Sequence, residues 1–228
     1  MGATGVKEEA RPSLELQFAD IRTRTPLGTL LTLESEIVEL PSPSKIPDAR
    51  DHDSGMYSFG SGVNQDYYRE KATHLAETSL INPVGFSLRS VGPTPAINAR
   101  LQMGGRKEDS LIIMDKRDYP SEPIYNFSAL MAGINPPFTN LSQATYVRID
   151  HHGDSWTLTA QFGTVQPKAV IWSNGVFYIG AKEPCQLNLE AQIYADNLPE
   201  PIQVPLIIAI QTKSRQFDLN EILLERDK

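Results

Sequence analysis

Apolar and polar residues alternate along much of the final third of the chain, a period-two pattern that is typical of strands with one buried face. From Leu187 to Ile193 every second residue is apolar, and Asn, Glu and Gln occupy the positions between. Residues 202–210 are apolar at most positions, which predicts a strand buried on both faces. Pro205 interrupts that run and favours a bulge or an edge position, because proline donates no backbone hydrogen bond.

Two hairpins are predicted in the same part of the chain. The Asn-Gly pair at 174–175 separates the apolar segments 168–173 and 176–179. Asn-Gly accepts the positive φ angles that a two-residue type I′ turn requires, so these segments are expected to pair with each other. A second hairpin is expected to join residues 146–150 to residues 156–160 across the polar segment between them.

The first half of the chain carries shorter β-compatible segments and one helix pattern. Asn64 can cap a helix that runs to about Thr78, because Tyr68 and Ala72 fall on one apolar face at helical spacing. Residues 217–226 form a second, short helix candidate with capping-box spacing. Strands are predicted over residues 14–18, 27–40, 86–91, 96–103 and 111–114.

Several strands at short spacing, without helices alternating between them, exclude a doubly wound α/β fold. The pattern predicts a mainly β protein: an antiparallel β-sandwich, jelly-roll-like, with one or two short helices. Residues 1–12 are polar and end in proline, so they are expected to form an extended N-terminal arm. Residues 13–228 then form a single β-sandwich domain with a long irregular insertion at about 41–63, where three prolines lie close together. Such segments have no core of their own, and we expect them to gain order by packing on neighbouring chains.

Charge and composition exclude several classes of protein. The 228 residues include 21 Lys and Arg against 28 Asp and Glu, a net charge of −7, so nucleic acid is expected to bind only weakly or indirectly. No apolar run reaches the roughly 18 residues of a membrane helix, and no secretory signal is present, so no membrane partner is expected. The single cysteine, Cys185, fits a reducing compartment. These features predict a cytoplasmic assembly or a virion as the location, without secretion through a signal peptide.

One polar segment combines imidazole and carboxylate side chains. Its members are Asp150, His151, His152 and Asp154. A metal-dependent enzyme could use this group together with Asp51 and His52, and this is the third functional interpretation. Neighbouring residues on a strand point to opposite faces, however, so His151 and His152 reach one ion only if the turn twists them together. A solvated hairpin turn is the competing explanation, and with it no metal and no other cofactor is expected.

Large aromatic residues suggest a second functional interpretation. Trp156, Trp172 and Tyr178 could form a platform on one sheet face, as in a carbohydrate-binding or other ligand-binding β-sandwich module. The competing explanation is that these rings belong to the core, where aromatic side chains bury the most area.

The leading functional hypothesis is a non-enzymatic structural subunit of a protein assembly, such as a viral capsid or coat-type protein. Its partners would be copies of itself or related subunits, and its mechanism would be subunit packing. The hypothesis is an analogy of architecture, since fold alone does not fix function. The loop residues expected to be buried between subunits are Met56, Tyr57, Phe59, Pro136, Pro137 and Phe138.

Overall fold

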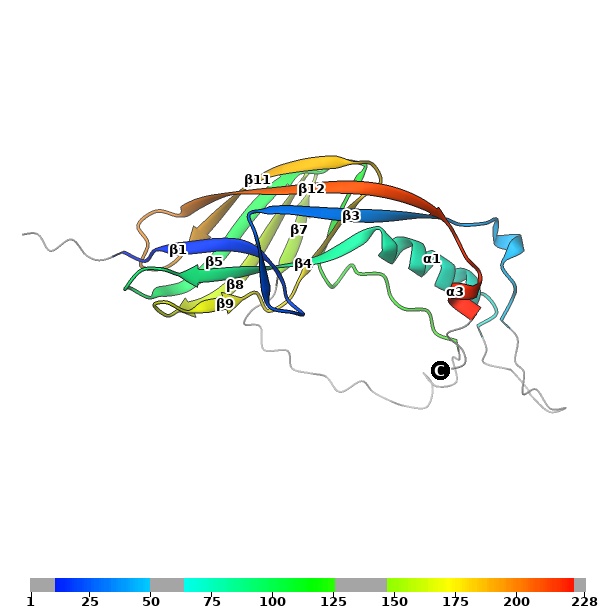
Figure 1. Ribbon diagram of the computed structural model, residues 1–228, viewed down its shortest axis with the longest axis horizontal. Coiled ribbons are helices and arrows are strands. Elements are labelled where there is room, and N and C mark those ends of the chain that lie inside the picture. Colours follow the sequence, from blue (N-terminus) through cyan, green and yellow to red (C-terminus); the bar gives the residue numbers. More distant parts are fainter. Residues whose placement is uncertain (1–10, 50–63, 126–146, 224–228) are drawn as a thin grey trace, which may run out of the picture.

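The computed structural model describes residues 11–49, 64–125 and 147–223, and it contains two packed β-sheets with short helices at one end (Figure 1). The predicted mainly β sandwich is therefore confirmed. Most of the predicted arm, residues 1–10, lies outside the described residues, as do residues 50–63 of the predicted insertion.

The first sheet, sheet A, has the strand order β2-β1-β4-β10-β6, with β9 also paired to β4. All of its pairings are antiparallel. Its strands are β1 (Leu14–Asp20), β2 (Thr25–Gly28), β4 (Ile81–Ser90), β6 (Leu111–Met114), β9 (Val170–Trp172) and β10 (Phe177–Ala181).

The second sheet, sheet B, has the order β3-β12-β11-β5-β8-β7. All its neighbours are antiparallel except β3 and β12, which run parallel over ten paired residues. The pairing of β12 with β3 begins at Ile207, two residues after Pro205. At Pro205 the neighbouring strand is therefore β11 alone, and the expected edge position is confirmed. The strands are β3 (Leu30–Glu39), β5 (Ala96–Arg106), β7 (Arg148–His152), β8 (Ser155–Val165), β11 (Cys185–Tyr194) and β12 (Ile202–Gln216).

The predicted hairpin around residues 174–175 is wrong. Both segments are strands, but β9 and β10 each pair with β4 rather than with each other. Residues 174–176 bulge out between them, because the backbone of Ser173 still bonds to Phe86 while Phe177 already lies opposite Val84. Pairing with a long central strand has overridden the local preference of Asn-Gly for a tight turn. The second predicted hairpin, β7 with β8, is confirmed.

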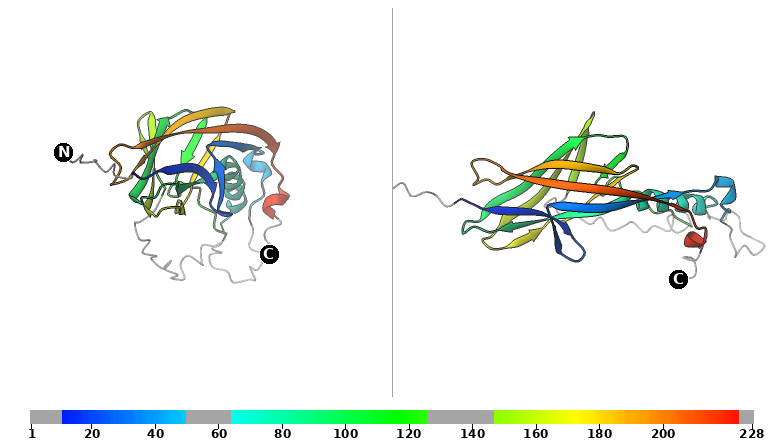
Figure 2. Two further views of the ribbon diagram at one scale, coloured as in Figure 1. Left: turned by 60° about the vertical axis from the view of Figure 1, so that its left-hand side comes forward. Right: turned by 45° about the horizontal axis from the view of Figure 1, so that its top comes forward.

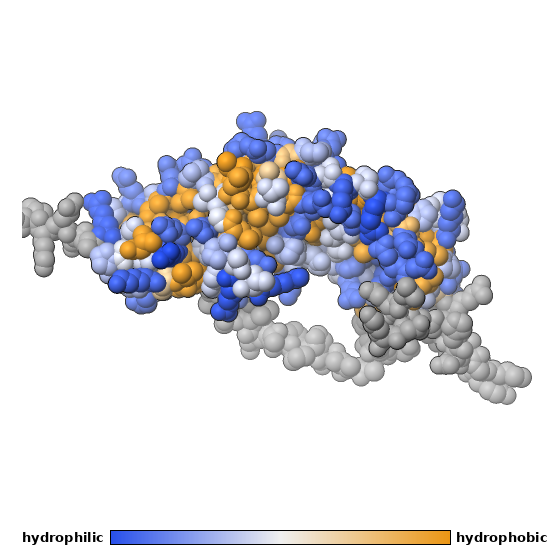
Figure 3. Space-filling model, viewed as in Figure 1, coloured by the Kyte–Doolittle hydropathy of each residue, from blue (hydrophilic) through white to orange (hydrophobic). Residues whose placement is uncertain are grey.

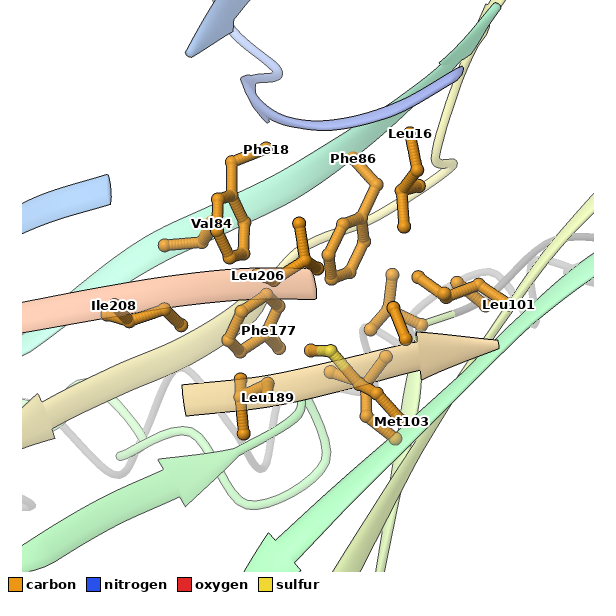
Figure 4. Close-up of a cluster of buried hydrophobic side chains, with 14 of the residues drawn as sticks. Leu16, Phe18, Val84, Phe86, Leu101, Met103, Phe177, Leu189, Leu206 and Ile208 are labelled. Carbon is orange, nitrogen blue, oxygen red and sulfur yellow. The ribbon is translucent and has the colours of Figure 1, made fainter. Parts of the chain in front are cut away.

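The main core lies between the sheets and is built around three stacked phenylalanines. The ring centroids of Phe18 and Phe86 are 5.8 Å apart, and those of Phe86 and Phe177 are 5.4 Å apart. All three side chains come from sheet A and are fully buried, and Figure 4 shows Leu206 of sheet B among them. Burial of each such side chain contributes about 1.5–3 kcal/mol, so this layer is a main source of stability.

A buried side-chain hydrogen bond joins sheet A to sheet B near α1. Ser35 of β3 is fully buried, and its hydroxyl oxygen accepts a hydrogen bond of 3.0 Å from the backbone N–H of Ala181 on β10. Next to it, Gly180 packs against the backbone of Leu80, and a Cβ atom at position 180 would lie 1.8 Å from the Leu80 carbonyl oxygen. Only glycine fits here, since the obstacle is backbone rather than a flexible side chain.

A side-chain pair joins the other edges of the two sheets. Asp115, just after β6, accepts the N–H of Ile149 on β7 at 2.9 Å, and Arg117 donates to the carbonyl of Ile149 at 2.8 Å. Burial would raise the pKa of Asp115, but hydrogen bonds from Arg117 and from the Ile149 N–H hold the pKa of this carboxyl below its usual value. The ionised pair thus satisfies both backbone groups of Ile149 in the way that a neighbouring strand would.

The helices lie beyond the sandwich, where β3 and β12 extend side by side (Figure 2). They are α1 (Tyr67–Ser79), the 3₁₀ turn η1 (Pro43–Lys45) and α3 (Asn220–Leu223). The predicted helix from Asn64 to Thr78 is therefore confirmed to within three residues, and the side chain of Asn64 accepts the N–H of Asp66 at its start. The predicted tail helix is found as α3 but begins at Asn220 rather than Phe217, and Asp218 accepts the N–H of Asn220 at its start.

Part of the proline-rich insertion packs on its own chain, which corrects one expectation. Ile46 and Ala49 are buried in a second apolar cluster with residues of α1 and α3. Arg69 of α1 ion-pairs with Asp48 and donates hydrogen bonds to the carbonyls of Pro43 and Ile46. Residues 41–49 therefore do not need a neighbouring subunit for their order, because the guanidinium of Arg69 supplies the partners that their backbone lacks.

We predict that Gly180→Ala lowers the free energy of unfolding by about 3 kcal/mol or more, because the new methyl group must displace backbone. The control is Gly153→Ala in the β7–β8 turn, where φ is 55° and nothing lies within 4 Å of the new atom. The free energy of unfolding of that variant should fall by only about 1–2 kcal/mol, which is the cost of an alanine in the left-handed backbone conformation. Urea unfolding measures both values, and equal losses would contradict the close contact at Gly180.

Candidate functional site

The three predicted platform aromatics do not share a surface. Trp156 is 1% exposed, its ring lies in the main core beneath Gly105, and its indole N–H donates to the carbonyl of Arg106. The prediction that Trp156 binds a ligand is therefore wrong, because β8 directs this side chain to the inner face of sheet B. Trp172 and Tyr178 lie on sheet A, opposite Ser87 and Pro83 of β4. These partners are four residues apart, which is about 13 Å along the strand, so the two rings are separate features.

The predicted metal group is also not formed. His151 and His152 sit on β7 and point to opposite faces: His151 borders a hollow beside Trp156, whereas His152 pairs with Ser155 on the outer face. Asp150 is ion-paired with Arg148 at 2.8 Å, and Asp154 lies in the turn. Within residues 11–49, 64–125 and 147–223, no group of three or more His, Cys, Asp or Glu side chains could hold a metal ion. Asp51 and His52 lie outside the described residues.

The predicted assembly contacts cannot be placed. Met56, Tyr57, Phe59, Pro136, Pro137 and Phe138 all lie outside the described residues, so these contacts remain predictions.

The outer face of sheet B instead carries an ordered set of hydrogen-bonding side chains. Because the inner residues of its strands are buried, every second side chain points outward. The strand register places one outward side chain from each of five strands in a single row, which we call the amide row. The amide row runs Gln203, Gln192, Gln102, Thr159 and Arg148. With strands about 4.8 Å apart, it spans about 19 Å.

A hollow of about 270 Å³ lies next to the amide row, at the Tyr194 end of β11. We call it the Tyr194 hollow. Tyr194, Arg100 and Gln161 are register partners across β11, β5 and β8, so they form a second row beside the first. The remaining lining residues are Asn98, Ala99, Gly163, Ala195 and Asp196.

The polar groups of the Tyr194 hollow hold one another in place. The Arg100 guanidinium lies 5.1 Å from the centre of the Tyr194 ring, and the Tyr194 hydroxyl donates to Gln192 of the amide row at 2.5 Å. The Asn98 amide donates to the carboxylate of Asp196, also at 2.5 Å. An aromatic ring, a guanidinium, a carboxylate and two amides are thus fixed around a small concave surface.

Both strands under the hollow depart from regular β-structure. The β5–β8 register shifts on both sides of Ala99, Asn98 has φ of 52°, and Gly163 opposite Ala99 has φ of 67°. A non-glycine residue in this region stores strain, and β-bulges of this kind are frequent beside binding sites. The register of β5 with β11 continues past Arg100 and Tyr194 to place Asn98 opposite Asp196, where the two side chains bond.

The sequence contained part of the signal for this site. The strand at 187–193 was predicted with a wet face of Asn, Glu and Gln, and that face is the one that carries Gln192. Tyr194, Arg100 and Asp196 were missed, because residues so far apart in sequence are joined only by the register of three strands.

Comparisons with known proteins add no family to this description. No family model and no curated protein matches the chain. A solved structure of a family 123 glycoside hydrolase from Clostridium perfringens is similar over 88% of this chain and 27% of its own, with 6% identity and a TM-score of 0.32. A structure named BspA_C_mut is similar over 87% of this chain and 46% of its own, with 6% identity and a TM-score of 0.27. The chain thus spans less than half of either protein, and similarities this weak carry no argument about function.

Among the residues that the structure describes, no helix has the length and apolar character needed to cross a bilayer.

Proposed function

We propose that the protein is a carbohydrate-binding β-sandwich module that holds a neutral, hydroxyl-rich ligand on the outer face of sheet B. The observation that carries this proposal is the alignment of the amide row with the Tyr194 hollow at its side. A carbohydrate-binding module is also the second interpretation of the sequence, but the proposed site contains Tyr194 instead of Trp156.

The side-chain chemistry of the site suits a sugar. Amides, carboxylates and guanidinium groups each offer two hydrogen-bonding atoms in a fixed plane, and neighbouring hydroxyl groups of a sugar can pair with both. The Tyr194 ring adds an apolar surface for the C–H groups of a sugar ring. At about 270 Å³ the hollow lies just below the roughly 300–1,000 Å³ of pockets for drug-sized ligands, so it fits one ring-sized group at a time.

The charges favour a neutral ligand. The charges of the site balance: Arg148 is ion-paired with Asp150, and the hollow is lined by one cation, Arg100, and one anion, Asp196. The amide row can then continue contacts with a longer chain over about 19 Å. We propose binding rather than hydrolysis, because Asp196 is the one carboxylate among the described residues that line the hollow, and glycoside hydrolysis commonly uses a pair.

We predict that Tyr194→Ala lowers the affinity for a bound oligosaccharide by about tenfold or more, since the central aromatic contact is lost. The ligand would be found on a printed array of neutral oligosaccharides and its affinity measured by calorimetry. Tyr194→Phe keeps the ring and removes only the hydroxyl, so it separates the contributions of these two groups to the affinity. Gln186→Ala is the matched control, because Gln186 is an exposed amide on the same face of β11, six residues from Gln192.

Two outcomes would overturn the proposal. The first is an array on which no oligosaccharide binds, and the second is a Tyr194→Ala variant that binds as tightly as the unchanged protein. Tyr194 lies on the outer face, so an unchanged melting temperature should show that the variant is folded.

A second candidate function, the structural subunit expected first from the sequence, is favoured by one exposed apolar patch. Leu30 of β3 is 60% exposed, and its register partner Ile207 on β12 lies beside it on the outer face. Leu27 of β2 is also exposed, and Figure 3 shows hydrophobic surface in the middle of this side, over β3 and β12. A patch of this kind can be covered by a second copy of the chain, as in a capsid, coat or other assembly.

For this second candidate we predict that Leu30→Lys shifts the protein from an associated form to a monomer, because a charge in the contact must lose its water. Light scattering over a range of concentrations measures the mass. Val170→Lys is the control, since Val170 is an exposed apolar residue on β9 of sheet A, whereas Leu30 lies on β3 of sheet B. A chain that is monomeric at every concentration before any substitution would contradict this candidate.

A further inference from the structure

A second hollow, of about 560 Å³, lies on sheet A, the opposite sheet from the proposed carbohydrate site. We call it the Tyr178 pocket. Its walls come from the β1–β2 turn, the end of α1, β4, the segment after β6 and β10. The residues that matter for its chemistry are Arg22, Thr78, Ile81, Pro83, Tyr119 and Tyr178.

The β1–β2 turn is held over sheet A by two local features. Ile21 folds onto Gly85, where a Cβ atom would lie 2.2 Å from the Ile21 side chain, so glycine is what allows the turn to approach the sheet. One oxygen of the Asp20 carboxylate accepts the backbone N–H groups of Arg22 at 2.8 Å and Thr23 at 3.2 Å. These hydrogen bonds, that from Thr23 first, lower the pKa of Asp20, so the carboxylate stays charged and committed to the turn.

The turn therefore presents Arg22 to the pocket as a positive charge. Within the described part of the chain, the Arg22 side chain makes no hydrogen bond or ion pair. The guanidinium presents planar N–H donors that match a carboxylate in a bidentate arrangement.

Two tyrosine rings form the facing wall. The ring centroids of Tyr119 and Tyr178 are 4.3 Å apart, with planes inclined by 41°. Burial raises the pKa of Tyr178, the neighbouring Tyr119 raises it further, and Arg22 opposes both effects. The Tyr178 phenol therefore remains protonated at neutral pH and can donate a hydrogen bond. Ile81 and Pro83 complete the pocket with apolar surface.

We propose that the Tyr178 pocket binds a small aromatic carboxylate. The carboxylate of the ligand would pair with the Arg22 guanidinium and accept a hydrogen bond from the Tyr178 hydroxyl. The ring of the ligand would pack on Tyr119, Ile81 and Pro83. A singly charged group fits better than a phosphate dianion, because one guanidinium is available and the Asp20 carboxylate lies in the same wall. A sugar fits less well, because the pocket combines apolar walls with one cation rather than with planar amides.

The experiment uses benzoate as the probe, with benzyl alcohol as its uncharged match and inorganic phosphate as a charged ligand without a ring. Ligand-observed NMR with the full chain should show benzoate bound about tenfold more tightly than either comparison compound. Arg22→Gln should lower the affinity for benzoate by about tenfold, and Tyr178→Phe by a smaller factor. Arg89→Gln is the control, because Arg89 is exposed on β4, six residues from Pro83, and should leave binding unchanged.

Three results would overturn the inference: no benzoate binding, equal binding of benzoate and benzyl alcohol, or phosphate bound as tightly as benzoate. Unchanged affinity in Arg22→Gln would overturn it as well. Arg22 is exposed, so this variant should fold, and its melting temperature checks that it does. The inference is independent of the carbohydrate proposal, since neither Arg22 nor Tyr178 belongs to sheet B.

Discussion

Burial of the inner face of sheet B is the constraint on which the rest of the molecule depends. Leu101, Leu158 and Ile193 are fully buried, and each can reach the core in only one register of its strand. A slip by one residue would turn these side chains to solvent and would turn Gln102 and Gln192 inward. The same burial that stabilises the sandwich therefore aligns the polar side chains of the outer face.

Contacts between the two sheets keep that register while leaving the outer faces free. On one side, the buried Ser35 hydroxyl joins β3 to β10, and Gly180 of β10 packs closely on the backbone of Leu80 at the end of α1. On the other side, the Asp115–Arg117 pair satisfies the backbone of Ile149. These contacts use backbone groups and side chains that point inward or lie at the sheet edges. Two residues with positive φ, Asn98 and Gly163, lie beneath the Tyr194 hollow.

Local pattern predicted most of the strands, and nonlocal pairing accounts for the failures. The alternation at 187–193 and the long apolar run at 202–210 became β11 and β12, because burial acts on each segment separately. The Asn-Gly pair at 174–175 did not form a hairpin, since β4 offered partners to both flanking segments. In the site, the wet face of β11 was predictable, whereas the meeting of Tyr194 with Arg100 required knowledge of which strands are neighbours. For Trp156 the sequence offered both interpretations, and the structure bears out burial in the core, because Trp156 shares the inner face of β8 with Leu158 and Ala160.

The central claim is that the outer face of sheet B, rather than sheet A or the β7–β8 turn, recognises a hydroxyl-rich ligand. Titration of the ¹⁵N-labelled protein with an array-positive oligosaccharide tests it most directly, because backbone amide shifts report the location of binding. The account predicts shifts grouped at residues 98–104, 157–161 and 190–196, with the amides around Tyr119 and Tyr178 unchanged. Shifts confined to sheet A, or scattered without relation to the amide row, would contradict it.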